Sequence, residues 1–288
     1  MANNITLFKK YVPLLDEVYK EAALTSVLDS DSSLAQAGAN ANEIVIPKIS
    51  MDGLGDYDRN SGYTNGDVTL TNETVKFNYE RGRMFTVDAM DNEETAGIAY
   101  GKLASEFIRT KVAPEGDAFR FATYAGVEGI SSASGSLADG AAVITALRAA
   151  INKMDEDEVP YEQRFLFITP TLKGMIEDLD TTKSREVLAR FAQVISVPQT
   201  RFYTAIDLKS GKDGEAAGGY VKNADGKNIN FMVVHKPAVM QYNKHIAPKV
   251  VSPEANQDAD AWKFGYRKYA LADVYENKVA GIYVHHQA

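Results

Sequence analysis

Two stretches of this 288-residue chain carry too few large apolar side chains to build a core of their own. Residues 29–42 read DSDSSLAQAGANAN, and residues 51–67 are rich in glycine and aspartate. Burial of apolar surface has to offset the conformational entropy that a segment loses when it becomes ordered. We therefore expect both stretches to depend on surface supplied from elsewhere, and a second copy of the chain is the favoured source.

The second stretch lies inside a long hairpin predicted for residues 43–90. Residues 44–49 (IVIPKI) read as a strand, and Pro47 places that strand at an edge or a bulge. The return, 68–87, alternates apolar and polar residues around Val75 and Phe77. Because two strands alone are at best marginally stable in water, the hairpin must pack on its own domain or on a neighbouring subunit.

The hairpin also holds the residues that we expect to contact another copy. Arg81 and Arg83 form a small basic cluster on the return strand, which either pairs with acids of a neighbouring chain or lies in solvent. Arg59 and Tyr63 belong to the glycine-rich tip. The candidate assembly contacts are therefore Arg59, Tyr63, Arg81 and Arg83.

A long helix is predicted for residues 93–113, where apolar residues recur at helical spacing. Gly97, Gly101 and Ser105 repeat every four residues and form a bare face, on which we expect close packing by another backbone. Pro114 is expected to break or kink this helix and to start a second one.

Beyond residue 126 the pattern changes to alternating helices and strands. The serine- and glycine-rich segment 126–140 reads as a linker and a domain boundary, and 143–154 reads as a helix. A buried strand is predicted for 164–168. At the end of the chain, 262–274 and 279–284 are expected to pair as a closing hairpin.

Charge and composition exclude several classes of function. Thirty-nine acids against 31 lysines and arginines give a net charge of −8, so sequence-reading nucleic-acid binders are disfavoured. The absence of cysteine removes disulfides, thiolate zinc sites and cysteine nucleophiles. Uninterrupted apolar runs are only as long as strands, so no membrane span is expected.

Motifs for catalysis or cofactor binding are not found. Neither the phosphate-binding loop G-x-x-x-x-G-K nor the G-x-S-x-G elbow occurs. His285 and His286 are neighbours that cannot share one metal ion on a strand, and we interpret them as a solvated tail. The acidic run 155–158 lacks the spacing of a calcium loop. We expect no catalytic, cofactor-binding or metal-binding residues, no cofactor and no enzyme activity.

The order of these elements resembles that of tailed-bacteriophage major capsid proteins of the HK97 type. Local phrases also resemble members of that family, namely VAPEGDAFRFA at 112–122, VPQTRFYTAIDL at 197–208 and WKFGYRKYALADVYENKVAGIYV at 262–284. The resemblance implies an α+β capsid fold with five parts. These are an N-terminal arm (1–42), an extended loop (43–90), the spine helix of a peripheral domain (91–125), an axial domain (126–243) and a return to the peripheral sheet (244–288).

The function implied by this resemblance is self-assembly into an icosahedral shell that encloses phage DNA. Its partners would be further copies in pentamers and hexamers, a separate scaffolding protein, a portal and accessory proteins, with DNA enclosed but not read. Many family members carry a long cleavable N-terminal region, whereas the arm here begins almost at Met1, which suggests a separate scaffolding protein or an already processed chain. The expected location of the protein is the virion capsid, which would assemble in the cytoplasm of the bacterial host. No membrane partner is expected.

Some family members carry a lysine–asparagine crosslink, but none is expected here. The lysines of the extended loop, Lys48 and Lys76, lie near its base or along its return strand and not at its tip. Two alternatives stay open. Within the same fold, the chain could instead form the shell of an encapsulin-like compartment. From another class, it could be a hydrolase or carbohydrate-binding protein that uses its acidic loops and aromatic strands.

Overall fold

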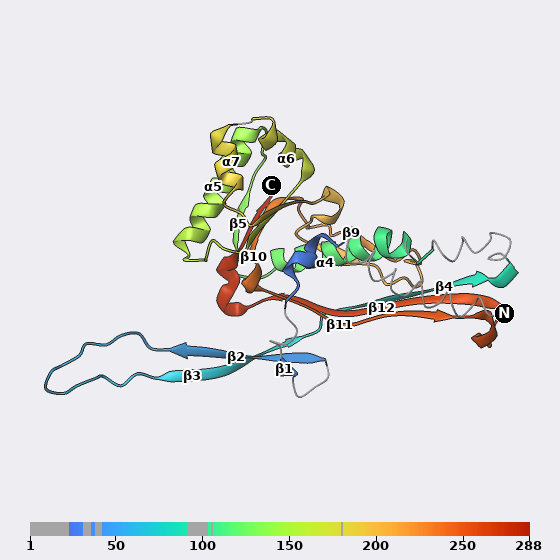
Figure 1. Cartoon of the computed structure of the whole chain (residues 1–288), viewed down its shortest axis with the longest axis horizontal. Helices are drawn as coiled ribbons and strands as arrows, with labels where there is room; N and C mark the ends of the chain where they lie inside the picture. Colours follow the sequence, from blue (N-terminus) through green and yellow to red (C-terminus); the bar gives the residue numbers. More distant parts are fainter. Residues whose placement is uncertain (1–22, 31–35, 38–41, 91–102, 105, 180) are drawn as a thin grey trace.

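The computed structural model of the chain describes residues 23–30, 36–37, 42–90, 103–104, 106–179 and 181–288. Figure 1 shows three parts: helices around a five-stranded sheet, a long three-stranded sheet with a helix along it, and a two-stranded hairpin that projects away from both. No helix in these ranges is long and apolar enough to cross a membrane.

The five-stranded sheet has the order β5-β13-β10-β6-β7, with β10 at its centre. Its strands are β5 (Ser131–Ser134), β6 (Arg164–Ile168), β7 (Gln193–Ser196), β10 (Ile229–His235) and β13 (Ile282–His286). β10 runs antiparallel to both of its neighbours, whereas β5 with β13 and β6 with β7 are parallel pairs. Every residue of β10 is buried, because both faces of the sheet are covered.

Helices pack on both faces of this sheet. One face is covered by α5 (Gly140–Glu156), α6 (Pro170–Glu177) and α7 (Thr182–Leu188). The apolar residues whose spacing predicted a helix all face this layer: Val143, Leu147, Ala150, Ile151 and Met154. The opposite face packs on α4 (Ala113–Ala125), where the rings of Phe121 and Phe167 lie 5.1 Å apart.

The long three-stranded sheet has the order β11-β12-β4 and carries the spine helix. Its strands are β11 (Val239–Val251), β12 (Ala261–Val274) and β4 (Tyr79–Asp88), all antiparallel. Ile108 and Val112 of the helix pack on Phe264 and Tyr266 of β12. β4 approaches β12 closely at Gly82, where an added Cβ would lie 2.9 Å from the carbonyl oxygen of Tyr266.

The predicted closing hairpin is wrong. β12 pairs with β11 and β4, while β13 crosses to the other sheet and pairs with β10 and β5. The apolar part of β13, Ile282 to Val284, is buried in the five-stranded sheet, with Ile282 and Val284 in the core on one face and Tyr283 in the core on the other. Residues 282–286 therefore do not complete the sheet to which the range 244–288 was assigned.

Two other segments differ from their sequence interpretation. The expected linker 126–140 contains β5, which adds an edge strand through four residues paired with β13. At Pro114 the helix does not break: a π-helical turn, Ile108–Val112, leads directly into α4. The wider turn accommodates a proline that cannot donate a hydrogen bond. Gly97, Gly101 and Ser105 lie outside the described residues.

The projecting hairpin consists of β2 (Glu43–Met51) and β3 (Val68–Lys76), and β1 (Gln36–Ala37) pairs with the base of β2. The return strand is not continuous, because Phe77 and Asn78 separate β3 from β4. The Asn78 side chain donates to the carbonyl oxygen of Ala272 and accepts from its amide nitrogen. The remaining elements are the pair β8 (Ile206–Leu208) with β9 (Tyr220–Lys222), and the 3₁₀ turns Leu24–Leu28, Gln199–Arg201, Lys236–Ala238, Pro253–Ala255 and Glu276–Gly281.

Candidate assembly surfaces

The base of the hairpin is anchored on its own chain. Ile44 and Val75 form a cross-strand pair and are buried against Met240, Tyr242 and Leu271. Further out, the Lys48 ammonium lies 2.6 Å from a carboxylate oxygen of Glu276. Beyond this ion pair the two strands project away from the rest of the chain, as Figure 1 shows.

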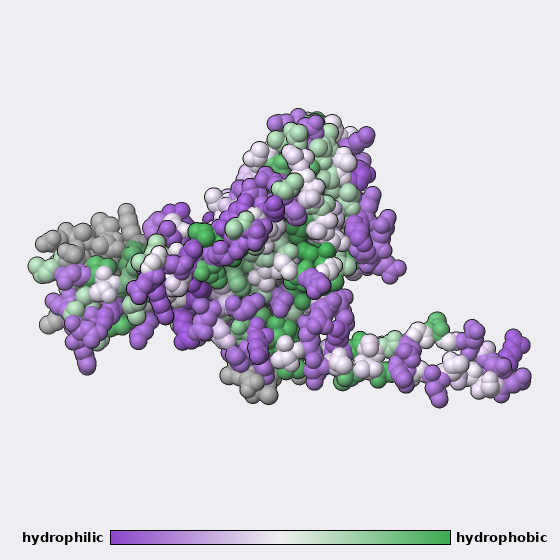
Figure 2. Space-filling view, turned by 180° about the vertical axis from the view of Figure 1, so that it is seen from behind, coloured by the Kyte–Doolittle hydropathy of each residue, from purple (hydrophilic) through white to green (hydrophobic). Residues whose placement is uncertain are grey.

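The outer half of the hairpin exposes an apolar surface on one face. Ile49 stands opposite Leu70, and Met51 stands opposite Val68. Because side chains alternate along a strand, these four lie on the face opposite to the one that buries Ile44. Their side chains are 54% to 68% exposed. Figure 2 shows hydrophobic residues along the hairpin and hydrophilic residues at its end. We call Ile49, Met51, Val68 and Leu70 the hairpin patch.

The tip, residues 52–67, has a defined turn. The Asp58 carboxylate accepts a hydrogen bond from the backbone amide of Asn60 at 2.6 Å. The backbone amides of Asp58 and Gly62 each donate a hydrogen bond to the carbonyl oxygen of the other residue. Gly62 has a φ of +83°, which suits a residue without a Cβ. The ring of Tyr63 meets Tyr57 edge-on at 4.8 Å and remains 87% exposed.

The four predicted contact residues fall into two groups. Arg59 and Tyr63 are exposed at the tip. Arg81 and Arg83 lie on β4 and bond to their own chain, an outcome that neither sequence interpretation included. The Arg81 guanidinium donates to the Glu115 carboxylate at 2.7 Å and to the Gly219 carbonyl, and Arg83 donates to the Ala216 carbonyl at 2.8 Å. The pair thus holds the glycine-rich loop 209–219 against β4.

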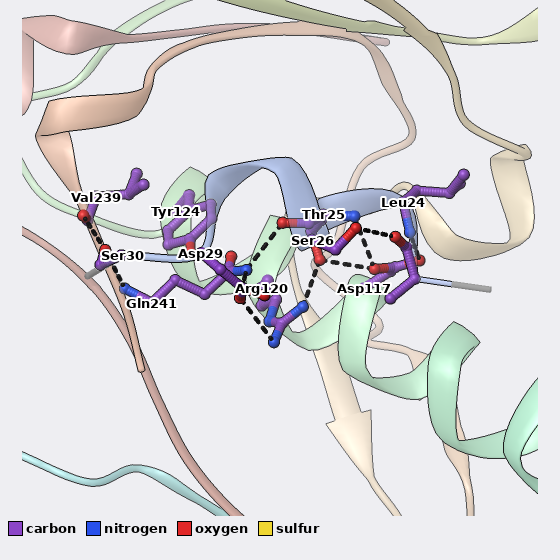
Figure 3. Close-up of polar contacts among 11 residues, drawn as sticks. Leu24, Thr25, Ser26, Asp29, Ser30, Asp117, Arg120, Tyr124, Val239 and Gln241 are labelled. Carbon is purple, nitrogen blue, oxygen red and sulfur yellow. Dashed lines mark hydrogen bonds and ion pairs between the residues drawn. The ribbon is translucent and has the colours of Figure 1, made fainter. Parts of the chain in front are cut away.

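A buried polar cluster, drawn in Figure 3, holds residues 24–30 on the spine. The carboxylate of Asp117, fully buried on α4, accepts hydrogen bonds from the backbone amides of Leu24 and Thr25 and from the Thr25 hydroxyl. Arg120 donates to the same hydroxyl at 2.6 Å, and Arg201 lies 3.2 Å from the carboxylate. We call residues 24–30 the latch.

Gln241 on β11 holds the other end of the latch. Its amide nitrogen donates to the Thr25 carbonyl at 2.8 Å and to Asp29 at 2.6 Å, while its amide oxygen accepts from the Tyr124 hydroxyl. The backbone of Gln241 also pairs with Ser30. Burial raises the pKa of Tyr124, which keeps this phenol neutral. The latch is therefore fixed to both the spine and the long sheet.

No motif in the sequence predicted this cluster. Two acids of this helix, Glu115 and Asp117, are buried and paired with cations, Glu115 with Arg81 and Asp117 with Arg201. The available signal was five charged residues within 109–120 on a helix with an apolar face, which places some of them towards the core.

Lys268 on β12 is also buried, at 1% exposure, with its ammonium 5.6 Å from the centre of the Tyr79 ring. Burial, and next the Arg120 charge, lower the pKa of Lys268 to about 7, against an opposing effect of Asp29 and Asp117. Lys268 thus changes charge near neutral pH.

The histidines form no site in the part of the chain that the structure describes, where no group of three potential metal ligands occurs. The interpretation of His285 as part of a solvated tail is wrong: it is 5% exposed, stacks on Phe231 and contacts the Asn230 amide at 2.9 Å. It is buried because β13 joins the sheet core. Burial, and next the neighbouring His286, lower the pKa of His285.

Comparisons with known proteins identify the fold. No family model and no curated protein matches the sequence. Among solved structures, one of Gordonia phage Cozz has a TM-score of 0.60 at 12% identity, covering 93% of this chain and 86% of that one. The capsid structure of cyanophage P-SCSP1u has a TM-score of 0.57 at 13% identity, covering 88% and 85%. A virus-like particle from Pyrococcus furiosus has a TM-score of 0.55 at 9% identity, covering 93% and 98%. The chain has the α+β HK97-like fold of phage capsid structures.

Proposed function

We propose that this chain is a major capsid protein, a structural protein that self-assembles into an icosahedral shell around phage DNA. The hairpin patch carries the proposal: four apolar side chains on a projecting strand pair are left uncovered by the chain's own described residues. Such a surface is stabilised when another copy covers it. The HK97-like fold supports the same conclusion.

In this proposal the parts of the fold have separate tasks. The axial domain, 126–243, forms the centre of pentamers and hexamers, and it gains β13 from the C-terminus. The spine and the long sheet, from 91–125 and 244–288, form the peripheral domain. The arm, 1–42, and the extended loop, 43–90, reach neighbouring subunits. The latch would then set the direction in which the arm leaves the spine.

The proposed partners follow from the same assembly. They are further copies of the chain, a separate scaffolding protein, a portal and accessory proteins, and the location is the virion capsid after assembly in the host cytoplasm. The net charge of −8 suits a wall that encloses DNA without binding it tightly. We propose no enzyme activity, because the buried charged groups Asp117 and Glu115 hold structural elements together.

Size-exclusion chromatography and negative-stain microscopy test the proposal on the full chain, expressed alone and with the products of neighbouring genes. Closed shells of uniform size are the expected result. A compact monomer at high concentration under both conditions would contradict it. A monomer that also binds a sugar or hydrolyses a glycoside would instead favour the hydrolase or carbohydrate-binding alternative.

A second candidate is the shell of an encapsulin-like protein compartment. The observation in its favour is the structural likeness to the virus-like particle from Pyrococcus furiosus. The contents of purified particles separate the two candidates. Nuclease-protected DNA indicates a capsid, whereas a protein cargo without DNA indicates a compartment.

A further inference from the structure

A cavity of about 490 Å³ opens between the spine helix, β4 and the glycine-rich loop 209–219. Its volume lies within the range of about 300 to 1,000 Å³ that is common for binding pockets. Aromatic side chains form part of the lining, including Phe85, Phe107 and Tyr266. It therefore has room and apolar surface for an aromatic group.

Positive charge dominates the lining of this cavity. Five lysine and arginine residues line it against two acidic ones, Glu106 and Glu115, although burial lowers the pKa of one of the five, Lys268, to about 7. The five are Arg81, Arg83, Lys111, Lys209 and Lys268. Arg81 is paired with Glu115, and Lys209 is paired with Glu215. Within the described ranges, Arg83 and Lys111 have no acidic partner and remain exposed, so they are available to an acidic occupant.

The tip of the hairpin is acidic and carries exposed tyrosines, so its charge is opposite to that of the cavity lining. Residues 52–67 contain four aspartates against one arginine. They also carry the exposed side chains of Leu54, Tyr57 and Tyr63. Asp56 and Asp67 use their carboxylates in no ion pair or hydrogen bond within the described part of the chain. Tyrosine rings can in addition stack on guanidinium or ammonium groups.

The tip cannot fill the cavity of its own chain. In Figure 1 the hairpin projects in the direction opposite to that of β4 and the spine. The base of the hairpin is fixed by the buried pair Ile44 and Val75, so the whole hairpin would have to turn back. An acidic tip that reaches such a cavity must come from another copy.

We infer that the acidic, tyrosine-bearing tip of one subunit docks in the basic cavity of a second subunit, with Arg83 and Lys111 facing its aspartates. This inference rests on the proposed assembly and names the two surfaces that would meet. Residues 1–22 are a weaker occupant, because their three lysines balance three acids and leave no net charge to match the cavity. Opposite charges also set the register of such a contact.

Charge reversal on each surface tests the inference. The cavity variant is R83E/K111E, the tip variant is D56K/D67K, and the swap variant carries all four changes. Each two-site variant is expected to lower the yield of particles by about tenfold or more, because like charges then face each other. The swap variant is expected to recover most of the yield. The conservative variant R83K/K111R keeps the charges and is the matched control.

The outcomes separate this inference from the proposed function. If the unaltered chain forms no particles, the proposed function fails. If it forms particles and the cavity variant does so equally well, or if the swap variant shows no recovery, the docking inference alone is overturned. Circular dichroism and thermal melting of each variant establish that the subunits are folded.

Chemical crosslinking identifies the occupant directly, since the chain has no cysteine of its own. In assembled particles, a bismaleimide is expected to join subunits of Y63C/K111C into a covalent ladder, and to give at most dimers with either single variant. An F8C/K111C crosslink without one in Y63C/K111C would assign the cavity to residues 1–22 and would overturn the inference.

Discussion

The Thr25 hydroxyl donates a hydrogen bond of 2.7 Å to the Asp117 carboxylate, and both residues are fully buried although 92 positions separate them in the sequence. The same carboxylate accepts the backbone amides of Leu24 and Thr25. The contact thus joins the N-terminal segment to the spine through a carboxyl group inside the protein. A buried carboxylate with this many donors is costly to remove.

We expect Asp117→Ala to lower the free energy of unfolding by about 3 kcal/mol, because it leaves buried donors unpaired and removes the partner of Arg201. Urea unfolding of unassembled subunits measures the change. Thr25→Ser, which keeps the hydroxyl, is the matched control and should shift the midpoint much less. An equal midpoint for Asp117→Ala and the unaltered chain would show that the latch contributes no stability.

The hairpin patch should matter for assembly and little for folding. We expect I49K/L70K to keep the melting temperature of the subunit and to abolish particles, because the two lysines replace a cross-strand apolar pair that none of the chain's described residues covers. S50K/T69K places the same charges on a cross-strand pair of the other face of the same hairpin and is the control. If the control impairs assembly equally, the effect belongs to charge and not to the patch.

Removal of the tip should separate folding from assembly in another way. Met51 and Val68 face each other, so Asn-Gly can replace residues 52–67 as a two-residue turn. We expect a folded subunit with unchanged far-ultraviolet circular dichroism that assembles poorly, since the tip contributes nothing to the described core. Sedimentation velocity gives the fraction in particles. Normal particle formation would remove the tip from the assembly mechanism.

Lys268 should make stability depend on pH above neutrality. Its pKa is lowered to about 7 in the folded chain, so between pH 7 and its ordinary value of 10.5 the unfolded chain binds more protons than the folded chain. Stability from this group therefore rises with pH across that window, by about 1.4 kcal/mol per pH unit at most. Below pH 7 the cost of burying the charged amine is fully present.

Comparison with Lys268→Met isolates this effect, because methionine keeps the length of the side chain and does not titrate. The unfolding free energy of each protein is measured in urea from pH 7 to pH 9. The value for the unaltered chain minus the value for Lys268→Met should rise steadily as pH rises. A difference that stays constant across this range would show that Lys268 keeps its charge when folded.

Local elements were predictable because their signals are local. The strand 164–168 and the helix around 143–154 follow from side-chain periodicity, and both occur as β6 and α5. The shortage of apolar residues in 51–67 likewise follows from composition, and the tip there is exposed. The HK97-like fold itself was predicted from a resemblance, because the order of the elements and three local phrases are similar to those of that family.

Only the tertiary structure decided which distant segments meet. Nothing in the sequence distinguishes β13 as a partner of β10 from β13 as a partner of β12, because strand patterns do not specify their neighbours. The same holds for Arg81, which bonds to Glu115, and for Asp117, which bonds to Thr25. A charge pattern shows that a residue needs a partner, whereas the partner is chosen by how the whole chain packs, at separations that no local pattern encodes.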